Sequence, residues 1–374
     1  MPRELKEEIE LKHLSPYATK SRLSRGRRRR QDDCPVRTMF ERDTGRIIYS
    51  MPFRRLRQKT QVFFNPRNDH ICTRMEHVIY VMYLSMTIGK ALNLNQDLIQ
   101  AISLGHDLGH APFGHAGEDS LNKTIKEQGG RFRFQHELHS LRTVDLLAEH
   151  KSQPGLNLSF EVRDGIASHC GESISEYKLE PWRDKTEAEL ILGAEEHRPP
   201  ATLEGCVVRI VDRIAYVGRD IEDAYRAGLM SFSDIPLHIR AELGDSNSAI
   251  VNTLVLDLLS NSYDQDAIVL SEARGEALRE LIEENYARIY KADQIIAYEN
   301  MVENVIKGLF KAFLAAAQGQ FSTSPEGELA LENFHNFLKR HPEKDASPIR
   351  KVTDYIAGMT DHYATTTFNS IYQI

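Results

Sequence analysis

The sequence predicts an all-α fold, with at most a short β-hairpin near the N-terminus. Hydrophobic residues recur at spacings near 3.6 in most segments, while strand-like alternation is confined to one short stretch. Clusters of Gly, Pro, Asn and Ser separate the periodic segments. A chain of 374 residues can bury a large core, and 41% hydrophobic with 27% charged residues is typical of a soluble globular protein.

Helices are expected where the apolar periodicity is clearest. In residues 75–92 the apolar side chains follow the helical spacing, and His77 falls on or beside that stripe. Asn95 or Asp97 can cap the next helix, which runs to His106. Further helices are expected over 137–150, 161–170, 185–195, 205–228, 249–261, 272–291, 298–317, 327–340 and 347–358. Thr44–Tyr49 is the one plausible strand, and residues 61–64 could be its hairpin partner.

Composition also indicates a compartment. No run of about 18 apolar residues predicts a membrane span, and the first residues lack the apolar core of a signal peptide. The cysteines are scattered without CxxC spacing, which favours reduced thiols over a disulfide framework or a zinc ribbon. They are Cys34, Cys72, Cys170 and Cys206. We therefore expect a cytoplasmic protein.

Positive charge is concentrated near the N-terminus. Residues 1–60 carry 17 Lys and Arg against 8 Asp and Glu, a net charge of +9, whereas the rest of the chain must carry −16 to give −7. The excess lies in Arg25–Arg30. It indicates a solvated, partly disordered arm, a contact with nucleic acid, or a contact with a neighbouring subunit's nucleotide site. The predicted organisation is an arm over 1–35 and one helical domain over 36–374, with a metal-site core at about 50–230.

A histidine and a carboxylate adjoin at His106-Asp107, inside a segment rich in His, Gly and Pro. Seven of the fifteen histidines lie between His70 and His139, which chance clustering explains poorly. Adjacent residues point about 100° apart on a helix, so both can ligate one ion only at a helix end that faces a cleft. The Gly and Pro residues just downstream supply such an end.

Two further residues complete a metal-ligand set. His77 supplies a third ligand from the preceding helix, although alone it could be a hydrogen-bonded core histidine. Asp212 follows an apolar Val/Ile run, where a carboxylate is costly to bury without a partner, and a metal ion would be such a partner. The alternative is an ion pair of Asp212 with Arg209 or Arg213. Together the two histidines and two aspartates predict one divalent ion, for which Mn²⁺, Mg²⁺, Fe²⁺, Ni²⁺, Co²⁺ and Zn²⁺ are all suitable.

These residues resemble a known family. Arg74–His77, His106-Asp107 and Asp212 are similar to the H…HD…D signature of the HD phosphohydrolase superfamily. His106–Glu118 resembles the central motif of a narrower branch, the dGTPase-like deoxynucleoside triphosphate triphosphohydrolases. Three other segments resemble the same branch, so the resemblance covers about residues 20–365: Ser50–Val62, Thr202–Ala224 and Asp354–Asp361.

The resemblance implies a helical fold and hydrolysis of a dNTP to a deoxynucleoside plus tripolyphosphate, by attack of a metal-activated water on the α-phosphate. His77, His106, Asp107 and Asp212 would be the metal ligands. The resemblance also implies a homo-oligomer, commonly a hexamer or tetramer. It leaves open whether an allosteric nucleotide is required.

The resemblance further implies catalytic roles for four residues. His115 would be the general acid that protonates the departing 5′-oxygen, and Glu118 would hold and polarise it. His136 would line the same pocket, and His110 would lie near the substrate phosphates. For His110 and His136 the alternative is a structural hydrogen bond to a metal ligand or to the loop backbone.

Substrate contacts follow from the same resemblance. Arg74 and Arg213 would bind phosphate, while Gln61, Tyr216 and Asp220 would contact the deoxyribose. A tyrosine ring beneath C2′ would exclude a ribose hydroxyl by crowding. The alternative for Asp220 is an ion pair with an arginine of its own helix, Arg219 or Arg226.

Two other functions compete. The first is another HD phosphohydrolase, a 5′-nucleotidase or a cyclic-nucleotide phosphodiesterase, which would keep the metal site and change the substrate. Gln61-Val62 and the Tyr216…Asp220 pair favour the dNTP branch over it. The second is a nucleic-acid-binding protein with a secondary HD site, which the basic segment Arg25–Arg30 suggests.

Overall fold

The computed structural model describes residues 2–61, 72–170, 177–226, 228–291, 293–320, 325–341, 343 and 346–372. Across these ranges the chain is predominantly helical, which confirms the predicted fold class. The β-structure consists of two antiparallel pairs of two-residue strands and isolated bridges. The pairs are β1 (Glu149–His150) with β2 (Gln153–Pro154), and β3 (Lys178–Leu179) with β4 (Ile268–Val269). All four cysteines are free thiols.

The predicted N-terminal strand is wrong. Thr44–Tyr49 lies in the second half of a helix and its C-cap, not in a hairpin. The Thr38 side chain and Glu41 form a capping box at the start of this helix, and its buried residues, Phe40 among them, follow helical spacing. This cap and the packing outweigh the β-propensity of the Ile-Ile-Tyr run. The expected partner, residues 61–64, lies almost wholly outside the described residues. The helices here are α1 (Pro2–His13), α2 (Met39–Ile48) and α3 (Met51–Arg55).

The arginine-rich segment Arg25–Arg30 packs against the rest of the chain, so the structure contradicts a disordered arm. Arg27 pairs with Asp43, and both side chains are buried. The Arg28 guanidinium lies 2.9 Å from the Asp145 carboxylate. Internal carboxylates and carbonyls therefore take up much of the charge that the sequence left for an external partner.

The first hydrophobic core surrounds three long helices, α4, α5 and α10, and it positions the histidine-rich segment. Each predicted helix in this half overlaps an observed one. Helix α6 was not predicted, because its Gly- and His-rich start reads as a loop. The helices are α4 (Arg74–Ala91), α5 (Gln96–Gly105), α6 (Gly114–Glu127), α7 (His136–Arg142), α8 (Phe160–Ala167), α9 (Glu189–Glu195) and α10 (Leu203–Arg226).

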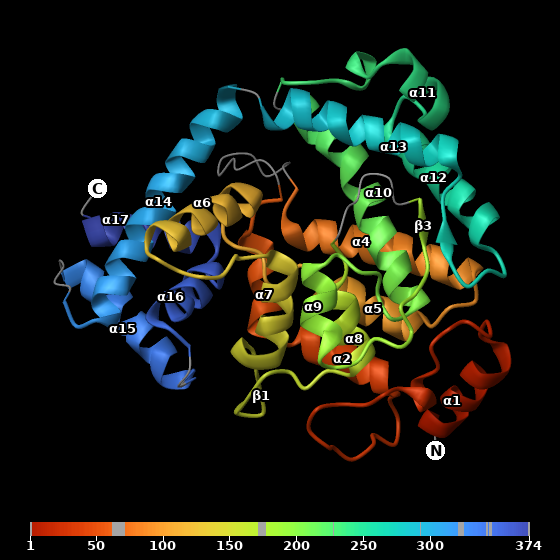
Figure 1. Ribbon diagram of the computed structural model, residues 1–374, viewed down its shortest axis with the longest axis horizontal. Coiled ribbons are helices and arrows are strands. Elements are labelled where there is room, and N and C mark those ends of the chain that lie inside the picture. Colours follow the sequence, from red (N-terminus) through yellow and green to blue (C-terminus); the bar gives the residue numbers. More distant parts are fainter. Residues whose placement is uncertain are drawn as a thin grey trace.

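A second core joins α6 to the C-terminal helices, which form one flank of the molecule (Figure 1). Helix α14 runs along α6, and α15, α16 and α17 pack around it. No helix in the described ranges has the length and apolarity needed to cross a membrane. The remaining helices are α11 (Leu237–Leu243), α12 (Asn247–Ser262), α13 (Glu272–Asn285), α14 (Asp293–Ala317), α15 (Pro325–Arg340), α16 (Pro348–Ala357) and α17 (Asp361–Tyr372).

Candidate active site

The four predicted metal ligands meet at one point between α4, α5 and α10. His77 Nε2 lies 2.9 Å from an Asp212 oxygen, and His106 Nε2 lies 3.7 Å from oxygens of both Asp107 and Asp212. His77 and Asp107 approach to 3.9 Å. Arg209, one of the two arginines weighed as a partner of Asp212, donates to the backbone carbonyls of Ser168, Arg198 and His197.

Local structure explains how the His-Asp pair reaches this point. Helix α5 begins at the N-cap Asn95, whose side chain accepts two backbone N–H bonds, and it ends with His106 as its C-cap. The pair therefore occupies the helix end that the spacing requires. Helix α4 begins with a Thr73–Glu76 capping box, which places His77 in its first turn.

The donor set fits a divalent ion. His106 is fully buried, and its Nδ1–H donates to the Ser103 carbonyl at 2.7 Å. Its Nε2 has no hydrogen-bond partner among the described residues. An unpaired buried nitrogen is costly, and an ion would supply the missing partner. The carbonyl contact is the outer-shell bond that usually orients a metal-binding histidine.

Charge around the site keeps the aspartates ionised. Burial alone would raise the pKa of Asp107, but Arg74, which donates to its carboxylate at 2.7 Å, and the nearby imidazoles hold that pKa well below its usual range. Burial likewise opposes ionisation of Asp212, but the hydrogen bond from His77 lowers its pKa to about 2. Both carboxylates are therefore ready to bind a cation at neutral pH.

A second group of histidines lies beside the first. The rings of His110 and His136 stack with centroids 3.8 Å apart, and His115 lies 6.0 Å from His136. Glu118 was expected to hold His115, but its carboxylate instead accepts from His136 Nδ1 at 2.9 Å. Gly109 allows the histidine-rich loop to pack closely against α7, since a Cβ at Gly109 would lie 2.0 Å from the backbone nitrogen of Ser140 in α7.

Within this group, His136 is the histidine whose pKa is raised. Burial opposes its charge, but Cys170 and Glu118 outweigh burial and hold the pKa of His136 well above its usual range. His115 is exposed to the cavity, yet the surrounding protein and the charge on His136 lower its pKa to about 4. Burial and Arg74 hold the pKa of His110 well below its usual range.

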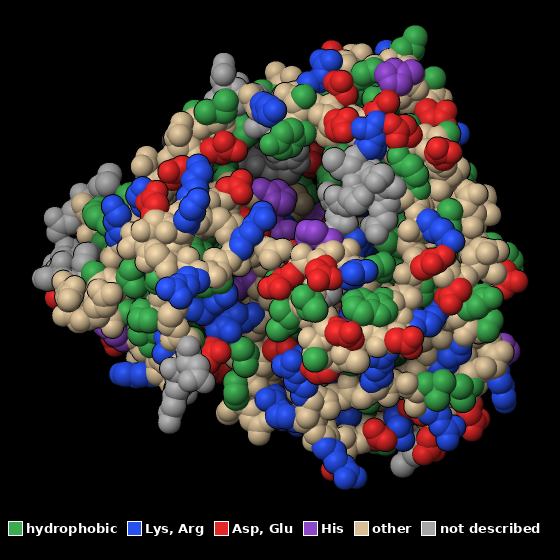
Figure 2. All heavy atoms as spheres, in the orientation of Figure 1, with side chains coloured by type: hydrophobic (Ala, Val, Ile, Leu, Met, Phe, Trp, Pro, Cys, Tyr) green, Lys and Arg blue, Asp and Glu red, His purple; other side chains and the backbone are tan. Residues whose placement is uncertain are grey.

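One cavity of about 590 Å³, a volume typical of small-molecule sites, is lined by three of the candidate metal ligands and by the histidines of the second group. They are His77, Asp107, Asp212, His110, His115 and His136. Figure 2 shows histidine side chains gathered in a hollow on this face. The predicted substrate residues Gln61, Arg74, Tyr216 and Asp220 line the cavity. Arg213 is buried and is not among the lining residues. Val62 lies outside the described residues.

The two arginines weighed as partners of Asp220 contact neighbouring carboxylates of the same helix. Arg219 donates to Glu222 at 2.8 Å, and Arg226 donates to Asp223 at 2.9 Å. Asp220 itself is buried at 2% exposure and faces the cavity.

Comparisons with known proteins agree with this geometry. The HD domain family matches residues 74–217, and the phosphohydrolase-associated domain family matches residues 268–370. A deoxyguanosinetriphosphate triphosphohydrolase-like protein of Caldanaerobacter subterraneus subsp. tengcongensis is 39% identical over 370 residues, which cover 99% of this chain and 95% of the relative. The chain belongs to this triphosphohydrolase-like family.

A second member of the family, from Desulfatibacillum aliphaticivorans, is 36% identical over 373 residues, covering 99% of this chain and 97% of the relative. Among solved structures, a phosphohydrolase from Bacteroides thetaiotaomicron matches with a TM-score of 0.46 at 18% identity. The matched region covers 86% of this chain and 66% of the Bacteroides protein.

The sequence analysis missed several members of the site. His169 and Cys170 belong to the histidine cluster, and His197 lines the same cavity. One signal was available, because His169-Cys170 stands at the end of the predicted helix over 161–170 much as His106-Asp107 stands at the end of its own helix. For Asp361 the sequence predicted no individual role. Its carboxylate binds the backbone N–H groups of Thr60 and Phe113, which ties the C-terminal helices to both walls of the site.

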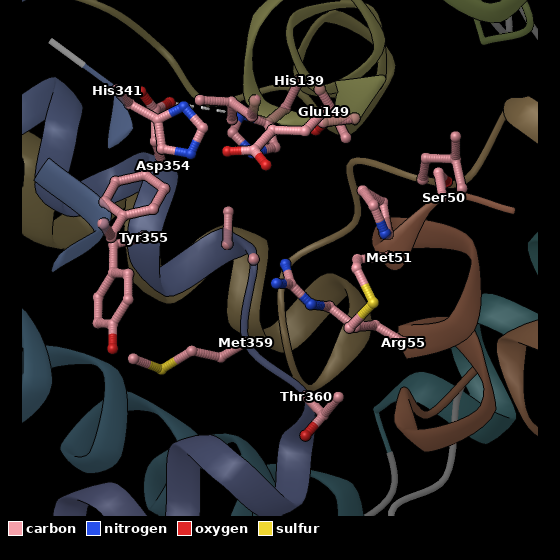
Figure 3. A pocket seen from close by; sticks show the side chains of 18 of the residues that line it. Ser50, Met51, Arg55, His139, Glu149, His341, Asp354, Tyr355, Met359 and Thr360 are labelled. Atoms are coloured by element: carbon pink, nitrogen blue, oxygen red, sulfur yellow. Dashed lines mark ion pairs between the residues drawn. The ribbon is translucent and has the colours of Figure 1, made fainter. Parts of the chain in front are cut away.

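A separate cavity of about 390 Å³ lies between α3 and the C-terminal helices. Figure 3 shows Arg55 and Met51 on one side and Tyr355 and His341 on the other. The Lys59 side chain, part of its wall, donates to the carbonyls of His110 and Ala357. The buried Lys59 thus connects the wall of this cavity to the histidine-rich loop, although the cavity itself is distinct from the candidate metal centre.

Proposed function

We propose that this protein hydrolyses deoxynucleoside triphosphates to a deoxynucleoside and tripolyphosphate, with a divalent ion held by His77, His106, Asp107 and Asp212. Membership of the triphosphohydrolase-like family supports a phosphohydrolase. The observation that carries the finer proposal is the cavity of about 590 Å³, which is lined both by three of the candidate metal ligands and by four predicted sugar and phosphate contacts.

Hydrolysis of the triphosphate needs a nucleophile, positive charge that stabilises the phosphoryl oxygens, and an acid that protonates the leaving oxygen. When bound, a divalent ion supplies Lewis-acid activation of water near neutral pH. Arg74 is buried and fixed by Asp107, so its charge is already oriented toward the cavity. Such fixed charge stabilises phosphoryl oxygens in the transition state.

The acid is His115. Water adds to the α-phosphorus, the bond from phosphorus to the 5′-oxygen breaks, and that oxygen takes a proton from His115. With a pKa of about 4, His115 is neutral in the free protein. The negative charge of a bound triphosphate raises that pKa, so that His115 takes up its proton when substrate binds. His136, held by Glu118, lies alongside and keeps the pocket positive.

Sugar selection is assigned to Tyr216, with Asp220 and Gln61 near the 3′-hydroxyl. Replacing Tyr216 by alanine should open space beneath C2′ and raise the ratio of NTP to dNTP turnover by about tenfold or more, the effect of relieving one steric contact. Tyr216→Phe keeps the ring and is the matched control, which should retain wild-type selectivity. Equal rejection of ribonucleotides by wild type and Tyr216→Ala would refute the steric account.

The direct test of the function is a panel of dNTPs and NTPs, alone and mixed, with each divalent metal, in which release of tripolyphosphate is measured. We expect tripolyphosphate from dNTPs and little from NTPs. Release of inorganic phosphate from nucleoside monophosphates, or opening of cyclic nucleotides, with no tripolyphosphate would instead support another HD phosphohydrolase.

A further inference from the structure

A second cluster of metal-type donors adjoins the first, at the end of α8. His169 is 2% exposed, and its Nδ1–H donates to the Ile166 carbonyl at 2.7 Å. Its Nε2 has no hydrogen-bond partner among the described residues. His106 shows the same arrangement, with its Nδ1–H bonded to the carbonyl three residues before it and its Nε2 unpaired. His169 is therefore oriented as a metal ligand is.

Two other donors face the same point. Cys170 Sγ lies 3.1 Å from His136 Nε2. The other ring nitrogen of His136 donates to Glu118 at 2.9 Å, which forms the carboxylate–histidine pair that orients metal-binding imidazoles. The donor atoms of His136, His169 and Cys170 all lie within 4.8 Å of one another.

We propose that His136, His169 and Cys170 bind a second divalent ion, of the Zn²⁺ type, next to the ion of the H…HD…D set. Two imidazoles and a thiolate form a soft ligand set that selects zinc. In a tetrahedral site of this kind the S···N separation is about 3.5 Å, so the observed contact must widen by only a few tenths of an ångström.

The fourth position of this ion faces the centre already described. Asp212, His106 and His169 also have donor atoms within 4.8 Å of one another, so Asp212 lies between the two ligand sets. Catalytic two-metal sites place their ions about 3.5–4 Å apart, often with a shared ligand. The first set, of two histidines and two aspartates, accepts a wider range of metals. The chain would thus hold a mixed centre.

This assignment sharpens the roles of the histidines. A nitrogen bound to an ion cannot deliver a proton, so His136 becomes a ligand and His115 remains the proton donor. The inference concerns metal content and does not depend on which phosphate ester the protein hydrolyses.

A cobalt titration tests the proposal without any assay of activity. The metal-free full-length protein is titrated with Co²⁺ alone, and bound metal and the thiolate-to-cobalt charge-transfer absorption are measured together. Wild type should bind two equivalents, one of them with the charge-transfer band. Cys170→Ser should lose the band and one equivalent, whereas Asp107→Asn should keep the band and lose the other equivalent.

Controls keep every outcome decisive. Cys34→Ser removes a thiol far along the chain and should leave the band unchanged. His169→Asn keeps all thiols and should weaken cobalt binding at the band-forming site at least about tenfold, with circular dichroism confirming the fold. One equivalent in wild type, absence of the band, or a band that survives Cys170→Ser would overturn the second site. Failure of dNTP hydrolysis with an intact titration would overturn only the proposed function.

Discussion

We expect Asp107→Asn to lose the ion of the H…HD…D set and to lower turnover by about 10⁴-fold or more, the order seen when one member of a concerted catalytic unit is removed. The Asp107 carboxylate lies 3.3 Å from His110 Nε2 and 3.9 Å from His77 Nε2, and it also pairs with the buried Arg74. Asparagine keeps the volume and can still accept from Arg74. The measurements are bound metal by elemental analysis and steady-state kinetics with dNTPs.

The control for this variant is Asp119→Asn, because Asp119 lines the same cavity but is exposed and stands outside the ligand cluster. It should keep its metal. Thermal unfolding of both variants separates loss of the ion from loss of the fold. Stoichiometric metal at the H…HD…D set together with a wild-type rate in Asp107→Asn would show that the ligand assignment is wrong.

We expect His115→Ala to lower turnover at saturating dNTP by about 10²–10⁴-fold, the usual contribution of a general acid, while metal content stays normal. His115 faces the cavity in the first turn of α6 and is not part of the clusters whose donors could hold an ion. The loss should fall on kcat rather than on KM, since protonation of the leaving oxygen occurs only in the transition state.

His197→Ala is the matched comparison, because His197 also lines the cavity but stands apart from the two histidine clusters. Its effect on kcat should be less than about tenfold. A loss of tenfold or less in His115→Ala would remove His115 from the acid role.

The sequence singled out four candidate metal ligands because their spacing follows local structure, and the structure brings the four side chains together. His106-Asp107 had to end a helix, and Asn95 had to begin it, since both positions follow from capping and helix geometry. The prediction of a strand at Thr44–Tyr49 was wrong because it relied on local β-propensity. The cap at Thr38 and the packing of α2 against α5 stabilise a helix there instead.

Contacts between residues far apart in the sequence could not be predicted from local sequence patterns. The family resemblance assigned Glu118 to His115, yet α7 places His136 Nδ1 2.9 Å from the Glu118 carboxylate. Cys170 was read only as a reduced thiol, because nothing in the sequence places it 3.1 Å from a histidine 34 residues earlier. The charge on Arg25–Arg30 suggested an external partner, whereas Asp43 and Asp145 were already available inside the fold.

The central claim is that water attacks the α-phosphorus of a dNTP. The most direct measurement is ³¹P NMR of the products formed in ¹⁸O-enriched water with metal-loaded protein. The account predicts tripolyphosphate carrying one ¹⁸O on a terminal phosphorus, with an unlabelled deoxynucleoside. Label in the 5′-hydroxyl, or products consisting of pyrophosphate with a monophosphate or phosphate with a diphosphate, would contradict it.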